Sequence, residues 1–459
     1  MDRRHAAPDF MSQDRVSRLL TLRSALAYLA LCAGVLSFLP GLGVAGAAAI
    51  ISAIVLGWRD LRLVARLLFG LLMVMTVIAI AIEPAALIGA ATSMTRLTAL
   101  IITVMLLSSM LGKSGDLGVI SKSLFAGSPL ARYYSVAFGT GFLAMPLNFG
   151  SVGVVSTMIR AEIDQQGDSA TTRNASRGAL RGFGASPIFS PLSISVVLTV
   201  TFVPALHSLQ LLAVSLPLAV VYLLAGALFL ERELPGSSAA GTSETRTTLA
   251  SLAPWLRFAA IIGAICASTF VLSGFFQLSY SRAVTLSCLG TVVLGLAHRR
   301  LYGGKITLPS MAPMSNELVI MGGSAFLGVL ISTFATRWLG ADFSLPGWSY
   351  PLAAFVVPSV FFMGGMIGFN PIVIGTLIGG VLGPIWPIEA VLGLGVAMVS
   401  GWGLTTAGTP YSANSLLLER LTGYSAQVAS LRWNMAMSIC CLVASGALAA
   451  TITLVKAGL

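Results

Sequence analysis

The stretch GASPIFSPLS, residues 184–193, decides the fold of this chain, because it interrupts a long apolar segment. Its two prolines remove backbone donors and its glycine loosens a helix, so a helix that enters this stretch must break within it. Unsatisfied backbone groups are costly in hydrocarbon. A break therefore persists only where protein, water, an ion or a substrate takes up the freed hydrogen bonds. We expect a broken helix with a polar site at its centre.

The composition indicates that lipid is the main solvent of the chain. Hydrophobic residues make up 56% of its 459 residues, and charged residues only 9%. A water-soluble protein of this length needs far more charge. The net charge of +11 comes from basic residues in short stretches between apolar segments, without a basic stripe interleaved with aromatics. This pattern sets membrane orientation and gives no reason to expect nucleic acid as a partner. The expected fold class is an all-α polytopic membrane protein in a lipid bilayer.

A transmembrane helix needs about 20 mostly apolar residues to cross about 30 Å of hydrocarbon. This measure predicts about 11 transmembrane helices, at residues 24–39, 42–57, 63–82, 97–112, 183–206, 209–230, 255–277, 283–298, 317–335, 390–415 and 430–455. Two further apolar stretches, 134–158 and 350–382, are interrupted by Gly, Pro and Asn near their centres. We interpret them as re-entrant hairpins that enter and leave the membrane on the same side.

The distribution of Lys and Arg supports this layout. With the N-terminus in the cytoplasm, all of the 27 Lys and Arg residues except four fall on the cytoplasmic side; the four are Arg96, Arg282, Arg337 and Lys456. Such a bias predicts a multi-pass protein of the bacterial inner (cytoplasmic) membrane. The basic tail, the first apolar run and GVAGA at 43–47 would also suit a cleaved signal peptide. We expect an uncleaved first span.

The chain also predicts two repeats. The sequence PLNFGS around Asn148 and the sequence GFNPIV around Asn370 are 222 residues apart, and the same offset places Ser190 on Ser412. Five spans per repeat is an odd number, so the two copies must have opposite orientations, and such repeats bind substrate near the bilayer midplane. The expected organisation is a cytoplasmic tail (1–23), a first helix (24–39), repeat 1 (40–230), a cytoplasmic linker (231–254) and repeat 2 (255–459).

Four interruptions carry the candidate binding site: MPLNFG (145–150), GASPIFSPLS (184–193), GFNPIVIG (368–375) and TTAGTPYSANS (405–415). Their hydroxyl and amide oxygens are hard ligands of the kind that a sodium ion accepts. The N-termini of half-helices offer partial positive charge to an anion. The candidate substrate- or ion-binding residues are Asn148, Ser151, Ser186, Ser190, Asn370, Thr409, Ser412 and Asn414. No other metal site or cofactor is expected.

Ionisable side chains are missing from the centres of the predicted spans, and Glu389 is the only acidic candidate near the core. This favours sodium coupling, or uniport, over a proton relay through a buried carboxylate. No cluster of catalytic side chains can be assembled, so we do not expect an enzyme. The predicted function is secondary transport of a small organic or inorganic anion. A proton-coupled transporter or exporter, a channel, and a polytopic membrane enzyme or lipid-handling protein are the alternatives.

Across nearly its whole length the chain resembles the ion transporter superfamily, which includes the divalent anion:sodium symporters. The hairpin tips, LNFG (147–150) and FNPI (369–372), keep the asparagine of that family's Ser-Asn-Thr triplet but not the flanking Ser and Thr. The sequence SPLS (190–193) is similar to the arsenite and sodium/proton-antiporter branch. The resemblance implies a first helix followed by two inverted five-helix repeats, an elevator mechanism and a homodimer.

Overall fold

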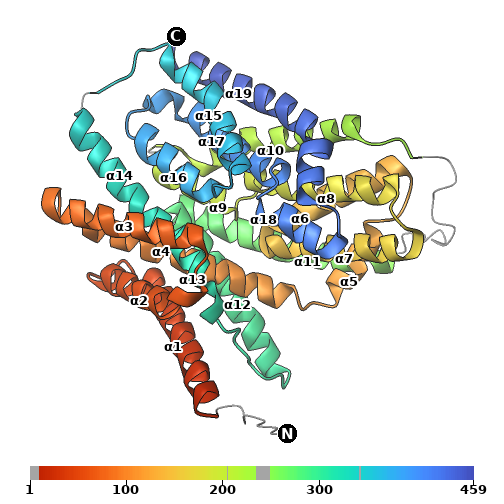
Figure 1. The fold of residues 1–459 in the computed structure, drawn as a ribbon, viewed down its shortest axis with the longest axis horizontal. Helices are drawn as coiled ribbons and strands as arrows, with labels where there is room; N and C mark the ends of the chain where they lie inside the picture. The colour runs from red at the N-terminus through yellow and green to blue at the C-terminus, as the bar shows by residue number, and fades with distance from the viewer. Residues whose placement is uncertain (1–9, 204, 234–248, 341–342, 459) are drawn as a thin grey trace, which may run out of the picture. The chain divides into compact units, whose positions relative to one another are not determined.

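The structure is a computed structural model, and in the part of the chain that it describes all regular structure is helical (Figure 1). The described residues are 10–203, 205–233, 249–340 and 343–458. The first residues of the predicted tail and most of the predicted linker lie outside them. Within the described ranges, 11 helices are long and apolar enough to cross a membrane. The expected fold class, an all-α polytopic membrane protein, is confirmed.

The chain divides into two compact units. The first contains, within the described residues, 10–103 and 298–330. Its elements are α1 (Phe10–Val35), α2 (Leu42–Leu56), η1 (Trp58–Asp60), α3 (Leu63–Ile82), most of α4 (Ala86–Leu111), the end of α12 (Tyr280–Leu301), η3 (Ala312–Met314), α13 (Ser315–Glu317), the π-helix η4 (Leu318–Gly323) and the start of α14 (Ser324–Leu339).

The buried side chain of Arg23 on α1 connects the parts of this first unit. Its Nη1 donates to Asp60 Oδ2 at 2.6 Å, and its Nη2 donates to Ala312 O at 2.6 Å and to Ser315 Oγ at 2.9 Å. Gly57 makes room for this arrangement, since a Cβ there would lie 2.2 Å from Ser315 Oγ. One guanidinium thus joins segments almost 300 residues apart in the chain.

The second unit contains residues 104–297 and 331–459 and carries all the candidate site residues. Its elements, besides the shared helices α4, α12 and α14, are α5 (Asp116–Ser123), α6 (Pro129–Leu147), α7 (Phe149–Gln166), α8 (Ala170–Phe189), α9 (Ile194–Phe202), α10 (Ser208–Ala225), η2 (Gly226–Phe229), α11 (Leu249–Gly274), α15 (Ser349–Met366), α16 (Pro371–Leu382), η5 (Ile388–Ala390), α17 (Val391–Gly408), α18 (Ala413–Thr422), the π-helix η6 (Val428–Asn434) and α19 (Met435–Ala457).

The expected interruptions are present, although the candidate spans differ from the predicted set at two places. The stretch 350–382 forms the helical hairpin α15–α16, and 134–158 lies within the hairpin α6–α7. The 11 candidate spans include Ser349–Met366, one arm of a hairpin, whereas Leu42–Leu56 is shorter than a full span. The predicted span 42–57 thus corresponds to α2, a helix of only 15 residues.

Helix α8 begins at Ala170, well before the start predicted at 183. A capping box between Ser169 and Thr172 satisfies its first backbone donors. Its first half, ATTRNASRGALRG, is polar but mostly buried inside the protein. Hydropathy alone therefore assigned this half to a loop, because it measures suitability for lipid rather than for a polar protein interior.

Helix α8 crosses α17 at very short distance because glycines face each other there. A Cβ added to Gly184 would lie 2.4 Å from Ala407 Cβ and 2.9 Å from Gly403 O, and one added to Gly403 would lie 2.4 Å from Gly184 O. On another side of α8, a Cβ at Gly182 would lie 2.2 Å from Ala137 O of α6. Small residues allow such close helix packing in membranes. They fix the two broken helices against each other.

We predict that Gly403→Ala destabilises the protein by about 1–3 kcal/mol, because the new methyl group must displace the α8 backbone. The measurement is thermal unfolding of the purified protein in detergent. Gly263→Ala is the matched control, since Gly263 lies on α11 with no heavy atom within 4 Å of an added Cβ. Equal unfolding temperatures for the two variants would contradict the close crossing.

Candidate functional site

The first break separates α8 from α9. Ser190 caps the end of α8: its N–H donates to Ser186 O at 2.9 Å, and its Oγ accepts from Leu192 N at 3.2 Å. Ser193 begins α9, and its Oγ accepts from Val196 N at 3.3 Å. Ser190 is fully buried and Ser186 is only 5% exposed. The two predicted serines therefore lie at the break, where Ser190 already serves the local backbone.

The second break separates α17 from α18. Thr409 caps the end of α17, and its Oγ1 donates to Thr405 O at 2.8 Å. Ser412 begins α18, and its Oγ accepts from Ser415 N at 3.2 Å. Ser415, which the sequence did not single out, joins the two sides: its Oγ accepts from Ser412 Oγ at 2.9 Å and donates to Thr409 O at 2.9 Å. All these groups belong to one polar turn, in which Thr409 and Ser415 are buried and Ser412 is partly buried.

The two breaks repeat one local pattern, SPLSIS at 190–195 and TPYSAN at 409–414. Ser193 and Ser412 are both N-caps and lie 219 residues apart, and the helix-ending residues Ser190 and Thr409 have the same spacing. The structural partner of Ser190 is therefore Thr409 rather than Ser412, and the predicted offset of 222 is three residues too long at the breaks.

Two further residues occupy equivalent positions, Ser195 and Asn414, one turn into the second half of each helix. Ser195 Oγ donates to Pro187 O, and Asn414 Nδ2 donates to Thr406 O at 3.3 Å, in each case to a carbonyl eight residues earlier. Asn414 is 1% exposed, and its Oδ1 is buried without a hydrogen-bond partner. An unpaired buried acceptor costs about 1–3 kcal/mol. This oxygen is therefore a candidate ligand.

The asparagines at the two hairpin tips are used differently. Asn148 alone separates α6 from α7 and has a φ of 48°. Its carbonyl accepts from Ser151 N at 3.1 Å and from Ser151 Oγ at 2.8 Å. Asn370 has extended backbone and is the N-cap of α16, with Oδ1 accepting from Ile372 N at 2.9 Å. The Asn370 oxygen thus holds its own helix, whereas the Asn148 side chain caps neither neighbouring helix.

The tip of the second hairpin packs directly on the second break. A Cβ at Gly365 would lie 2.3 Å from Thr405 Cγ2 and 3.0 Å from Thr409 Cγ2, and one at Gly368 would lie 3.9 Å from Tyr411 Cγ. The hairpin tip that carries Asn370 thus lies beside Thr409 and the turn of the second break.

The tip of the first hairpin lies against α8 and α18. Phe149, next to the tip, stacks on Phe183 of α8 with ring centroids 5.6 Å apart. Ala144 and Val152 form a buried cluster with Phe183, and Leu417 of α18 packs against it. This cluster places the first hairpin beside the helix that follows the second break.

Helix α8 also buries a guanidinium that the sequence did not predict at a span centre. Arg181 is fully buried, and its Nε donates to Asn434 Oδ1 at 2.8 Å, its Nη1 to Gly226 O at 2.7 Å and its Nη2 to Trp433 O at 3.4 Å. The guanidinium also lies 5.8 Å from the Tyr133 ring. All these partners are neutral. The sequence analysis missed this arginine because the predicted span began at residue 183, whereas the candidate span is Ala170–Phe202.

The π-helix η6 connects this arginine to the second break. Asn434, the last residue of η6, accepts from Arg181, and its Nδ2 donates to Ala429 O at 3.0 Å. Ser430 Oγ, from the same π-helix, lies 3.4 Å from Ser415 Oγ at the break. π-Helical turns are often found at functional sites, and this one contacts both Arg181 and the second break.

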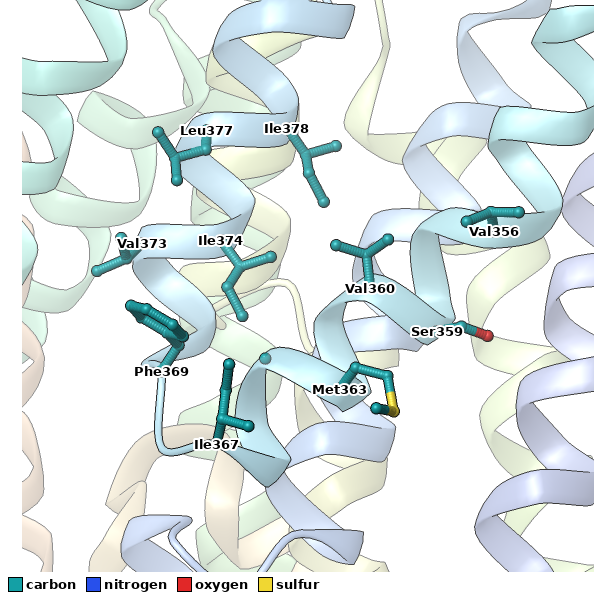
Figure 2. Close-up of a pocket in the computed structure, with 11 residues that line it drawn as sticks. Val356, Ser359, Val360, Met363, Ile367, Phe369, Val373, Ile374, Leu377 and Ile378 are labelled. Atoms are coloured by element: carbon teal, nitrogen blue, oxygen red, sulfur yellow. The ribbon is translucent and has the colours of Figure 1, made fainter.

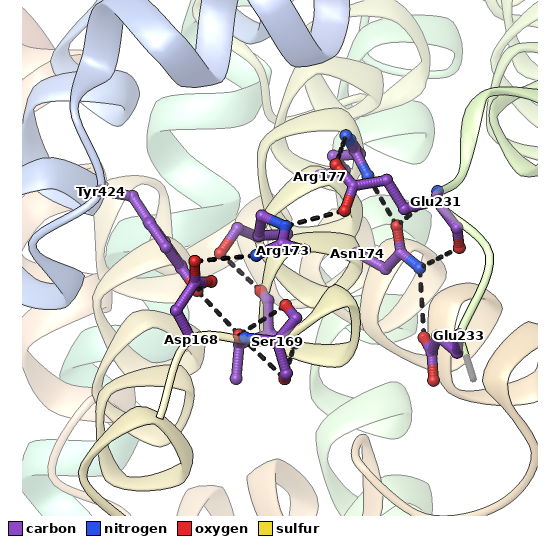
Figure 3. A network of polar contacts seen from close by, with 10 residues as sticks. Asp168, Ser169, Arg173, Asn174, Arg177, Glu231, Glu233 and Tyr424 are labelled. Carbon is purple, nitrogen blue, oxygen red and sulfur yellow. Dashed lines mark hydrogen bonds and ion pairs between the residues drawn. The ribbon is translucent and has the colours of Figure 1, made fainter. Parts of the chain in front are cut away.

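A network of ion pairs surrounds the start of α8 (Figure 3). Glu231 accepts from Arg173 Nε at 2.7 Å and from Arg177 Nη2 at 2.6 Å, and Asp168 accepts from Arg173 Nη1 at 2.8 Å and from Tyr424 Oη at 2.6 Å. The network therefore joins the first turns of α8 to the segment after η2 and to the loop after α18.

The Glu231 carboxyl has an altered pKa. Burial by itself would raise the pKa of Glu231, but hydrogen bonds from Arg173 and Arg177 outweigh it and hold the pKa below its usual value. For Tyr424 the direction is opposite: burial, and then the hydrogen bond to Asp168, raise the pKa of its hydroxyl. Glu231 is therefore a carboxylate, and Tyr424 a neutral donor, at neutral pH.

A second carboxylate, Glu233, completes this network. It accepts from Arg132 Nη2, from Thr171 Oγ1 at 3.0 Å and from Asn174 Nδ2 at 3.1 Å. The charges of this network are thus paired with each other. The remaining acidic candidate, Glu389, is exposed on η5. Neither the carboxylates of this network nor Glu389 lies at the breaks.

An apolar cavity of about 600 Å³ lies between the two arms of the second hairpin (Figure 2). Val360 and Met363 of α15 and Ile374 and Leu377 of α16 line it, and Ser359 is its only polar lining residue. Because hydrocarbon cannot solvate an ion, this cavity is unsuited to a charged ligand. The breaks remain the polar site of the second unit.

The fold and these interior breaks define a multi-pass α-helical membrane protein with polar residues at two interrupted helices. No family model matches the sequence, and no curated protein matches it. The fold is similar to that of the Alcanivorax borkumensis YdaH transporter, with a TM-score of 0.44 and 14% sequence identity over 81% of this chain and 88% of that chain. That transporter is described as having an unusual topology.

We predict that Asn148→Gly leaves the protein folded but weakens ligand binding about tenfold or more, because glycine accepts a positive φ but has no amide to bind a ligand. The measurement is ligand-induced stabilisation in a thermal-shift screen of small anions. Gln277→Gly is the matched control, since Gln277 has a φ of 54° and is exposed at the end of α11. Undiminished binding by Asn148→Gly would make Asn148 a purely conformational residue.

We predict that Glu231→Gln lowers the unfolding temperature at neutral pH, and that the difference from the unmodified protein vanishes in acid. The depressed pKa of Glu231 gives a stability contribution that is complete above about pH 4.3, the value for an unfolded glutamate, and is lost as pH falls through the folded value. Unfolding temperatures between pH 7 and pH 3 measure it. Glu389→Gln, at an exposed position, is the control for the substitution itself, and a Glu231→Gln difference that stays constant with pH would contradict the ion pairing.

Proposed function

We propose that this protein is a secondary active transporter of a small organic or inorganic anion, coupled to sodium. The observation that carries the proposal is the pair of matched breaks in two interior helices, each lined by Ser or Thr hydroxyls that are buried or partly buried, with the buried Asn414 amide at the second. Interrupted membrane helices of this kind bind substrates and coupling ions in transporters. Unpaired backbone at membrane depth otherwise carries a large cost.

Two features support an anionic substrate. Arg181 is a buried cation whose direct partners are all neutral, so the interior of the second unit has positive charge that an anion would offset. The N-terminus of α7, at the tip of the first hairpin, also offers partial positive charge to an anion.

Neutral oxygens at the second break support coupling to a cation. Asn414 Oδ1 is a buried acceptor without a partner, and it lies beside the C-terminal end of α17, which has partial negative charge. None of the described groups at the breaks is a carboxylate able to carry a proton. A proton-coupled transporter or exporter is the second candidate, because an anion can enter together with its own proton.

The recurring break pattern also supports two inverted repeats. We propose an elevator mechanism in which the second hairpin and second break move together, because Gly365 packs directly on Thr405 and Thr409. The protein would act as a homodimer in the bacterial inner membrane with its N-terminus in the cytoplasm.

The test uses purified protein in proteoliposomes and a panel of labelled carboxylates and inorganic oxyanions. We predict uptake of one class of anion when a sodium gradient is imposed at constant pH, and none from a pH gradient without sodium. Empty liposomes and liposomes treated with a sodium ionophore are the controls.

Two outcomes would contradict this function. Uptake driven only by the pH gradient would replace sodium coupling with proton coupling. Passive anion currents without a coupled ion gradient would replace a transporter with a channel.

A further inference from the structure

The two breaks share one backbone pattern but differ in chemistry at one position. Ser195 and Asn414 are equivalent, since each follows its N-cap by two residues and bonds a carbonyl eight residues earlier. Serine offers one oxygen that both donates and accepts, whereas asparagine donates through nitrogen and accepts through a separate oxygen. The same local bond therefore has a different consequence at each break.

At the first break this bond uses the serine hydroxyl. Ser195 Oγ donates its hydrogen to Pro187 O and lies 3.0 Å from Ser193 Oγ, which can then donate to it. A residue from another helix also contributes, since Tyr280 Oη of α12 donates to Pro191 O at 2.8 Å. Ser195 itself is 1% exposed. The first break is thus closed by groups of the protein.

At the second break the equivalent bond leaves the side-chain oxygen of Asn414 without a donor. Asn414 uses Nδ2 to reach Thr406 O, and its Oδ1 stays buried without a partner. Among the described residues this is the only side-chain amide oxygen in that condition; the other buried side-chain oxygens without partners are hydroxyls. An amide oxygen differs from a hydroxyl because it cannot become a donor by rotation. It requires an external donor or a cation.

The surroundings favour a cation. The Asn414 amide lies against Thr406, in the last turn of α17, where the final helical carbonyls concentrate partial negative charge. Nearby Ser415 and Ser412 already bond each other and the carbonyl of Thr409, so they stabilise the turn. A preformed turn with one free amide oxygen beside a helix C-terminus suits a small monovalent cation.

We infer that this chain has a single cation-binding site, built around Asn414 Oδ1 at the second break, and that Ser195 closes the corresponding position at the first break. The inference rests on the proposed function, and it adds that the coupling ion binds asymmetrically with a stoichiometry of one. It also assigns the determinant of this asymmetry to a single pair of equivalent residues.

The test exchanges these two residues in the full-length protein. Unfolding temperatures in detergent are measured in NaCl, LiCl and KCl at constant ionic strength, with choline chloride as the replacement salt. We expect one cation to stabilise the unmodified protein along a saturation curve with a Hill coefficient of about 1, because binding to the folded state raises stability.

Asn414→Ser should keep the bond to Thr406 O, as Ser195 does with Pro187, and should raise the cation concentration for half-saturation at least about tenfold. Ser195→Asn should keep the cation response. Thr98→Val is the matched control: Thr98 Oγ1 is also buried without a partner, but it belongs to the first unit, and its removal should leave the response unchanged.

Three outcomes would overturn the site: no cation response in the unmodified protein, an unaltered response in Asn414→Ser, or a Hill coefficient near 2. An unchanged response in Asn414→Ser together with its loss in Ser195→Asn would place the site at the first break instead. Failure of the proposed function is distinguishable. If Asn414→Ser loses the cation response but the unmodified protein shows no gradient-driven uptake, the cation site stands and the transporter function fails. If sodium drives uptake but Asn414→Ser does not change the cation response, the transporter function stands and this cation site fails.

Discussion

The close contact between α8 and its neighbours is the constraint on which the second unit depends. Glycine at positions 184 and 403 lets α8 and α17 approach each other closely, and Gly182 does the same for α8 and α6. Because helices packed this closely cannot slide along each other, the two breaks are held at fixed positions in the interior. The polar turns at the breaks are therefore shaped before any ligand arrives, as a selective site requires.

The electrostatics of α8 change along its length. Arg173, Arg177 and Arg181 follow at four-residue spacing and so lie on one face of the helix. The first two have carboxylate partners, whereas Arg181 has only carbonyls, an amide and an aromatic ring. Backbone carbonyls and the Tyr133 ring can solvate a guanidinium in place of a counter-ion. A positive charge is thus placed deep in a membrane protein without a neutralising acid among its direct partners.

Much of the fold could be predicted from hydropathy and helix breakers. The span 63–82 coincides with α3, and the hairpin 350–382 differs from α15–α16 by one residue at its start. The first half of α8 was missed because its polar side chains are buried by protein, and hydropathy cannot distinguish such a helix from a loop. The eight candidate residues lie at, or within one turn of, a hairpin tip or a break, and their binding role stays a prediction.

The remaining details of the site could not be predicted, because they depend on capping geometry. The equivalence of Ser193 with Ser412 is visible only once both are known to be N-caps. The free oxygen of Asn414 depends on which carbonyl its nitrogen reaches, eight residues back across a broken helix. In the sequence, SPLSIS and TPYSAN contain the relevant signal, but the offset taken from the hairpin tips obscured it.

The π-helix η6 has a consequence for how the last helix is oriented. A π-turn holds more residues than an α-turn, and each residue of an α-helix advances the chain by about 100° around the axis. Deletion of a single residue between Val428 and Asn434 would therefore turn the whole of α19 by roughly that angle. Faces of α19 now directed at α15 and α17 would turn away from them. The orientation of a 23-residue helix is thus encoded by the length of the seven-residue segment before it.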